Sequence, residues 1–177
     1  MNNKINILGI SGSLRDSSSN TSVLKAFFHL LPSHVDYSIF KGLDMLPHFN
    51  PGSEENEGVA ILRKAIAEAD AVIICTPEYA FGVPGVLKNA LDWTVSTGEL
   101  NEKPVSAISA SPLNSGGDKA LASLLLTLTA LGTRRNGRSA LSIPNIKMKL
   151  DLEGNLTDPE TIKLLKEQAD NLLGIIG

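Results

Sequence analysis

Two hydrophobic patterns alternate along this chain: short continuous apolar runs, and stretches in which apolar residues recur at spacings of three and four. A continuous run is typical of a strand buried on both faces, and the spaced pattern is typical of a helix with one buried side. The runs predict strands at 4–10, 35–40, 71–76, 104–110 and 138–143. The spaced stretches predict helices at 20–31, 58–69, 85–93, 119–131 and 159–173. Each predicted strand therefore precedes one predicted helix.

Five strand–helix units predict a parallel sheet, because buried strands joined by helices pair through right-handed crossovers. The predicted fold class is α/β, a flavodoxin-like doubly wound five-stranded parallel sheet in the order 2-1-3-4-5, with helices on both faces. In that order a ligand binds beyond the carboxyl ends of strands 1 and 3. We expect residues 1–177 to form one domain, because 42% hydrophobic residues suffice for one core in a chain of this length.

The loop after the first strand, residues 11–20, is rich in small and hydroxylated residues and leads directly into a helix. A helix N-terminus attracts anions, so this position favours a phosphate site. The loop lacks both a Walker motif and G-x-G-x-x-G, which leaves a phosphomonoester held by side-chain donors and by the guanidinium of Arg15. The other candidate donors are Ser13, Ser17, Ser18, Ser19, Asn20 and Thr21. The alternative is an ordinary flexible loop with Ser19 or Asn20 as helix cap.

The segment after the third strand, residues 76–93, contains two prolines and two glycines at or before the start of its helix. These residues favour an extended backbone with free N–H and C=O groups, and Tyr79 and Phe81 add flat apolar surface. A planar ligand with hydrogen-bonding edges suits such a loop. The structural alternative makes Phe81 a core residue, Pro84 the first residue of the helix and Trp93 part of its buried face. We adopt that alternative for Pro84 and Trp93.

Composition restricts the partners of the chain. A net charge of -3 gives no general attraction to nucleic acid or to anionic lipid, so we expect neither as a partner. The N-terminal apolar run is too short for a signal peptide, and no run approaches the ~20 residues of a membrane span. We therefore expect a cytoplasmic protein without a membrane partner. The single cysteine, Cys75, lies in an apolar run and is interpreted as a small buried thiol.

Three motifs, taken together, resemble those of one known family. They are G-S-L-R-x-x-S-x-N at 12–20, T-P-E-Y at 76–79 and P-G-x-L-K-N-A-x-D-W at 84–93. Together they resemble the NAD(P)H-dependent FMN reductase family, which includes related quinone, azo-dye and chromate reductases, and the likeness spans almost the whole chain. The resemblance implies a flavodoxin-like fold with FMN at the strand ends. It assigns the phosphate to Ser13, Arg15, Ser18 and Asn20, and the ring to Pro77, Glu78 and Tyr79.

The chain departs from the family pattern at two loops. Ala80 stands where the family usually has Asn, and Leu113 stands where Gly is common. The Gly-Gly pair of the loop after the fourth strand is kept. The further residues that we expect to contact FMN are Ala80, Phe81, Gly82, Ser111, Gly116 and Gly117, with Thr21 from the first loop. Residues 46–51 resemble a segment that borders the neighbouring subunit's flavin site in related dimers, which implies a homodimer or homotetramer; we interpret His48 within it as a surface residue.

The resemblance also implies the reaction. FMN would take a hydride at N5 from NADPH or NADH and pass electrons to a small acceptor such as a quinone or free flavin, in a ping-pong scheme. We expect no catalytic side chain and no metal, since the flavin carries the chemistry. Arg134, Arg135 and Arg138 form either a receptor for the 2'-phosphate of NADPH or a solvated basic cluster. Alternative functions are a flavodoxin-type electron carrier and a flavin-free binding or regulatory protein. A serine hydrolase is disfavoured because G-I-S-G-S at 9–13 fails the G-x-S-x-G pattern.

Overall fold

One parallel sheet organises the chain. The computed structural model describes residues 4–15, 17–52 and 56–177. Its strands lie in the order β2-β1-β3-β4-β5, and every neighbouring pair is parallel, as the alternation of strands and helices predicted. The strands are β1 (Ile5–Ser11), β2 (Val35–Ile39), β3 (Ala71–Thr76), β4 (Val105–Ala110) and β5 (Ala140–Ile143).

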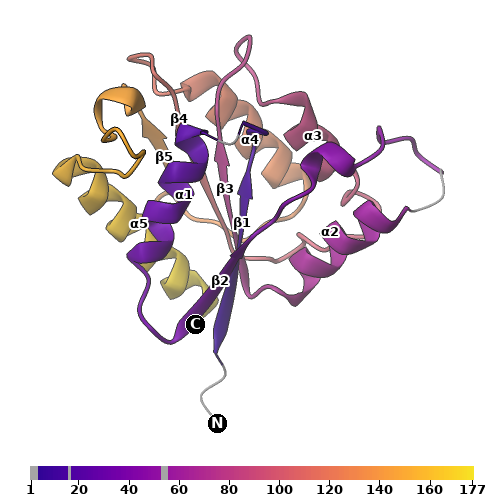
Figure 1. Ribbon diagram of the computed structural model, residues 1–177. Coiled ribbons are helices and arrows are strands. Elements are labelled where there is room, and N and C mark those ends of the chain that lie inside the picture. The colour runs from indigo at the N-terminus through magenta and orange to yellow at the C-terminus, as the bar shows by residue number, and fades with distance from the viewer. Residues whose placement is uncertain (1–3, 16, 53–55) are drawn as a thin grey trace.

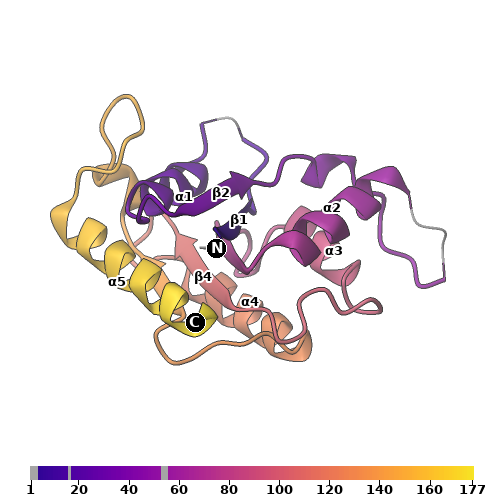
Figure 2. The same ribbon diagram turned by 90° about the horizontal axis from the view of Figure 1, so that it is seen from below.

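Helices cover both faces of this sheet (Figures 1 and 2). One face packs against α1 (Ser19–His29) and α5 (Pro159–Ile176). The other face packs against α2 (Glu57–Glu68), α3 (Gly85–Asp92) and α4 (Asp118–Ala130). Two short 3₁₀ helices, η1 (Leu43–Met45) and η2 (Ile146–Met148), follow β2 and β5.

The strands alternate between two hydrophobic cores. In β1, Leu8 and Ile10 belong to the core under α2, α3 and α4, whereas Ile7 belongs to the core under α1 and α5. Successive side chains of a strand point to opposite faces, so two covered faces require apolar residues at both parities. Every residue of β3 is buried for this reason, which explains its continuous apolar run. No helix among the described residues is long and apolar enough to cross a membrane.

The ends of several elements differ from the prediction. Ser18, rather than Ser19 or Asn20, caps α1, because its side chain accepts a hydrogen bond from the Asn20 amide. Pro84 is the N-cap of α3 with extended backbone, not its first helical residue. β5 begins at Ala140 rather than 138, because Asn136 accepts a hydrogen bond from the Arg138 amide and holds the preceding residues in a turn.

Candidate functional site

A cavity of about 220 Å³ opens where the loops after β1, β3 and β4 meet at the carboxyl edge of the sheet. Ser11 of β1 pairs with Cys75 of β3, so the first and third loops leave the sheet side by side. This is the switch point at which doubly wound sheets bind ligands. The lining residues are Ser13, Arg15, Ser17, Ser18, Ser19, Asn20, Pro77, Glu78, Tyr79, Ala110, Ser111, Pro112, Ile146 and Lys147.

The first loop presents the N-terminus of α1 to this cavity. Ser18 satisfies one amide of the first turn, with 3.2 Å between its Oγ and the Asn20 nitrogen. The side chain of Arg15 is exposed and has no hydrogen-bond or ionic partner among the described residues. An uncompensated guanidinium beside a helix N-terminus attracts an anion through charge and through N–H donors. The phosphate loop predicted from the sequence therefore has the required polarity.

Asn20 serves a structural role beneath the loop. It is 4% exposed, and its Nδ2 donates to the carbonyl oxygen of Ala110 at 3.4 Å. Its Oδ1 accepts a hydrogen bond from the Sγ of Cys75 at 3.3 Å. Asn20 thus joins the start of α1 to the ends of β3 and β4. Burial raises the pKa of the Cys75 thiol far above its ordinary value, so Cys75 stays protonated and is not a nucleophile, as predicted.

Thr21 lies outside this cavity. Its Oγ1 is 3.0 Å from the Oγ of Ser11, and the two hydroxyls hydrogen-bond each other. Thr21 lines a neighbouring cavity of about 480 Å³ between α1 and the loop after β2, which shares Ser13 and Arg15 with the first. Thr21 therefore shares a cavity with Ser13 and Arg15, but not the one that Ser18 and Asn20 line.

The loop after β3 forms a tight two-residue turn. The backbone N–H and C=O groups of Tyr79 and Gly82 bond reciprocally at 3.0 Å, and the central residues Ala80 and Phe81 have φ of 48° and 62°. Tyr79 is 51% and Phe81 is 79% exposed. The alternative that placed Phe81 in the core is wrong, because the turn projects its ring into solvent. Of this loop, only residues up to Tyr79 line the cavity.

We expect Ala80→Asn to stabilise the protein by about 0.5–1 kcal/mol, because asparagine tolerates positive φ better than alanine does. Urea unfolding of the two variants measures the difference. The same change at Ala67, an exposed residue of α2, is the control and should lower stability through helix propensity. Equal losses at both positions would contradict the assigned backbone conformation.

Glu78 connects the two loops that flank the cavity. Its Oε2 accepts hydrogen bonds from the amides of Lys119 and Ala120, each at 3.0 Å. α4 needs this contact because its own N-cap, Gly117, has no side chain to offer. The carboxylate of Glu78 is therefore directed to α4, and only the backbone and the stem of Glu78 are available to a ligand.

Replacing Glu78 with alanine should lower the free energy of unfolding by about 1 kcal/mol, the usual contribution of a helix N-cap. Chemical denaturation measures this loss. Glu153→Ala, which removes an exposed carboxylate outside any helix, is the matched control and should change little. If the two substitutions have the same effect, Glu78 does not cap α4.

Gly116 and Gly117 set the backbone conformation of the loop after β4 without lining the cavity. Both have positive φ, 65° and 80°, and they pack on the strands rather than line the cavity. The Oγ of Ser109 donates to the Gly116 carbonyl at 2.8 Å, which fixes the return of the loop toward α4. Ser111, in contrast, lines the cavity, and Leu113 is 62% exposed. The glycine pair therefore positions Ser111 rather than contacting a ligand from inside the cavity.

The sequence did not reveal Lys147, Ile146, Pro112 and Ala110 as lining residues. Ile146 and Lys147 belong to η2, which follows β5 and lies beside the start of α1 (Figure 1). The available signal was topological: every loop after a parallel strand emerges at the same edge.

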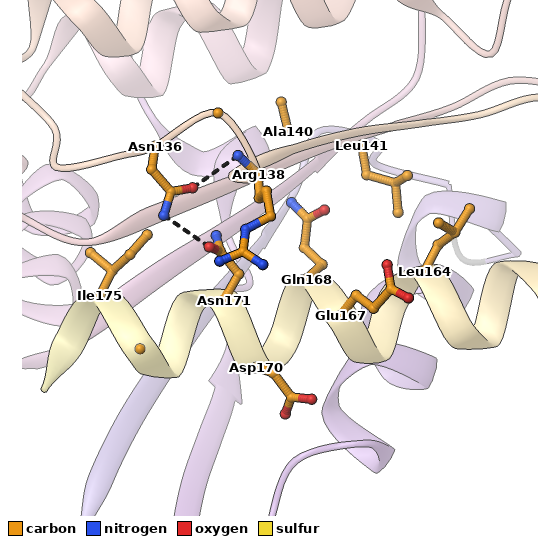
Figure 3. Close-up of a pocket in the computed structure, with 12 residues that line it drawn as sticks. Asn136, Arg138, Ala140, Leu141, Leu164, Glu167, Gln168, Asp170, Asn171 and Ile175 are labelled. Atoms are coloured by element: carbon orange, nitrogen blue, oxygen red, sulfur yellow. Dashed lines mark hydrogen bonds between the residues drawn. The ribbon is translucent and has the colours of Figure 1, made fainter.

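The arginine-rich segment lies elsewhere. Arg134, Arg135 and Arg138 precede β5 and so lie at the amino edge of the sheet, opposite the cavity. Arg134 donates to the carbonyl of Ile175 at 2.8 Å, and Arg138 lines a groove of about 620 Å³ between the start of β5 and α5 (Figure 3). This groove is larger than the cavity at the carboxyl edge, but the two share no residue. None of the three arginines lines the cavity at the carboxyl edge.

Residues 46–51 are held by α3. The carbonyl oxygen of Pro47 accepts from the Nε1 of Trp93 at 2.9 Å and from the Nδ2 of Asn89 at 3.0 Å. Trp93 is 3% exposed, which confirms it as a core residue. His48 is exposed, as expected, and does not line the cavity.

The described residues fit a phosphomonoester attached to a flat ring. The lining of the cavity includes the N-terminus of α1, a guanidinium that has no partner among the described residues, and the exposed Tyr79. A family model for NADPH-dependent FMN reductases matches residues 5–147. The chain belongs to this family. It is therefore an NAD(P)H-dependent flavin oxidoreductase with FMN as its cofactor. This family membership does not favour the alternatives of an electron carrier or a flavin-free binding protein.

Similar proteins agree with the family assignment. An NAD(P)H-dependent FMN reductase of Pseudomonas aeruginosa is 30% identical over 177 residues, covering 97% of this chain and 95% of that protein. An NADPH:quinone oxidoreductase of Arabidopsis thaliana is 32% identical over 174 residues, covering 92% and 87%. Among solved structures, the flavoenzyme NAD(P)H:(acceptor) oxidoreductase of Paracoccus denitrificans superposes with a TM-score of 0.87 at 29% identity, covering 97% of both chains. This FMN reductase family member thus aligns with these oxidoreductases over 92–97% of its chain.

Proposed function

We propose that this FMN reductase family member binds the FMN phosphate at the N-terminus of α1 and reduces a small quinone-like acceptor with NADPH or NADH. The observation that carries the proposal is the convergence of Arg15, the Ser18 cap and Tyr79 on one cavity at the carboxyl edge. Ser13, Asn20 and Ser111 complete the proposed binding set within the cavity. The single sheet supports treating residues 1–177 as one FMN-binding domain.

The size of the cavity supports a partly open site. About 220 Å³ is smaller than the ~300–1,000 Å³ of pockets that enclose a whole ligand. We infer that the cavity holds the phosphate end, while the ring lies against Tyr79 and the turn at 80–82. An exposed ring face admits a nicotinamide and an acceptor in turn.

The protein's contribution is binding and orientation. FMN, when bound, supplies the two-electron chemistry between the nicotinamide and the acceptor. Arg15 and the amides of α1 would fix the phosphate, and the Tyr79–Gly82 turn would offer backbone groups and a flat surface to the ring. The buried Cys75 leaves the site without a thiol nucleophile. A quinone acceptor is supported by the quinone oxidoreductase named among the relatives.

We propose a homodimer that covers this edge. Each segment that follows a parallel strand exposes a large apolar side chain at the carboxyl edge of the sheet, and exposed apolar groups at one edge favour association. These residues are Leu14, Met45, Tyr79, Phe81, Leu113 and Met148. Light scattering after size-exclusion chromatography would give the mass, and a monomer at micromolar concentration would reject the dimer.

Anaerobic reduction tests the proposed function. Purified protein loaded with FMN should lose the visible absorption of oxidised flavin when NADPH or NADH is added, and regain it with a quinone. Steady-state rates at several quinone concentrations should give parallel double-reciprocal lines, as a ping-pong scheme requires. A protein that binds no FMN, or holds FMN that nicotinamides do not reduce, would refute the proposal.

A further inference from the structure

The charges around the cavity are unbalanced. Its described lining contains three ionisable side chains that carry charge at neutral pH: Arg15, Lys147 and Glu78. The carboxylate of Glu78 is bound to two amides of α4 and faces that helix. Neither Arg15 nor Lys147 has a side-chain hydrogen-bond or ionic partner among the described residues. Among the described residues, the cavity therefore presents two cations without an ionic partner, together with the N-terminus of α1.

The backbone around Lys147 is fixed. The amide of Ile146 donates to the carbonyl of Ser111 at 3.0 Å, and the amide of Asn145 donates to the carbonyl of Leu113 at 3.2 Å. Ile146 is 1% exposed and anchors η2 in the core under α1 and α5. The Cα of Lys147 is thus held against the loop after β4, while its side chain stays exposed at the mouth of the cavity. Because the backbone of Lys147 is already ordered, its flexible side chain can move its ammonium group to a bound anion without ordering further backbone.

The ligand's charge calls for a second cation. A phosphomonoester carries roughly −1.5 to −2 charges at neutral pH, more than one guanidinium neutralises. We propose that Lys147 is a further phosphate-binding residue, which pairs with the FMN phosphate from η2 and so selects FMN over flavins that lack a phosphate. This inference rests on the proposed function, because it assumes that the phosphate end of FMN occupies this cavity.

Flavin binding to the apoprotein tests the proposal independently of turnover. The dissociation constants of FMN and riboflavin are measured by fluorescence quenching for wild type, Lys147→Gln and Lys147→Arg. We expect Lys147→Gln to weaken FMN binding about fivefold, the upper range of an exposed ion pair, and to leave riboflavin unchanged. Lys147→Arg should bind FMN as wild type does. Lys163→Gln is the matched control, because Lys163 lies on α5 with 77% of its side chain exposed and does not line the cavity.

Salt supplies a second measurement. Because exposed charges are screened, wild-type affinity for FMN should fall more steeply with ionic strength than that of Lys147→Gln. Unchanged FMN affinity in Lys147→Gln, or equal weakening of FMN and riboflavin, would overturn the role of Lys147. If wild-type protein binds FMN and the Lys147 variants bind it with the same dissociation constant, this inference is refuted and the proposed function is not. Wild-type protein that binds neither flavin refutes the proposed function as well.

Discussion

Arg15→Ala should weaken FMN binding by about 10- to 100-fold, the range of a hydrogen bond to a charged group. The guanidinium lines the cavity, has no partner among the described residues and lies beside the N-terminus of α1. The substitution removes no hydrogen bond or ion pair of the Arg15 side chain that the described residues show, so the free energy of unfolding without FMN should stay nearly constant. The change therefore acts on the bound state alone.

Titration of apoprotein with FMN and with riboflavin measures the effect. Riboflavin affinity should change little, because it has no phosphate for Arg15 to contact. Arg15→Lys should recover part of the loss, since an ammonium keeps the charge but not the paired N–H geometry. Arg138→Ala, at the opposite edge of the sheet, removes the same charge and serves as the control. Equal FMN affinity in Arg15→Ala and wild type would remove Arg15 from the site.

Gly116→Ala should lower the free energy of unfolding by about 2–4 kcal/mol, because it combines a positive φ with a steric clash. A Cβ at this position would lie 2.4 Å from the Oγ of Ser142 and 3.0 Å from the nitrogen of Pro144. The backbone atom of Pro144 cannot move without shifting the end of β5. The loop that carries Ser111 to the cavity would be displaced, so FMN affinity should fall together with stability.

Two other glycines separate the causes of this loss. Gly98 has φ of 75° and no atom within 4 Å of the place that a Cβ would take, so Gly98→Ala should reveal the conformational cost alone, about 1–2 kcal/mol. Gly137 has open space and no positive φ, so Gly137→Ala should be nearly neutral. Thermal or urea denaturation of the three variants gives the ranking. If Gly116→Ala is no more damaging than Gly98→Ala, the close packing against Ser142 is not present.

The sequence predicted correctly the elements whose hydrophobic pattern depends only on neighbouring residues. The continuous run at 71–76 and the spaced pattern at 58–69 match β3 and α2 almost residue for residue, because burial on two faces and burial on one face leave different periodicities. The switch point then followed from strand order. The sequence left the role of Arg134, Arg135 and Arg138 open, and the structure places them before β5 at the amino edge.

The contacts that shape the site are between segments distant in sequence. Glu78 caps a helix that begins 40 residues later, at Asp118, and Asn20 bonds to Cys75 and Ala110 from α1. Such pairings depend on how the loops leave the sheet, which no local pattern encodes. The turn at Ala80 and Phe81 is similar: neither residue type favours positive φ, so only the closed bond pattern between Tyr79 and Gly82 reveals it.

The sequence by itself determined the order of strands and helices, the edge of the sheet at which the candidate cavity lies and the polar loop that precedes α1, because hydrophobic periodicity and helix-end chemistry act over a few residues. Tertiary structure alone decided that Lys147 joins Arg15 at the cavity, that Thr21 lines the neighbouring cavity and that the carboxylate of Glu78 caps α4. These placements arise from the packing of separate loops on one sheet, where the position of each side chain depends on all the others.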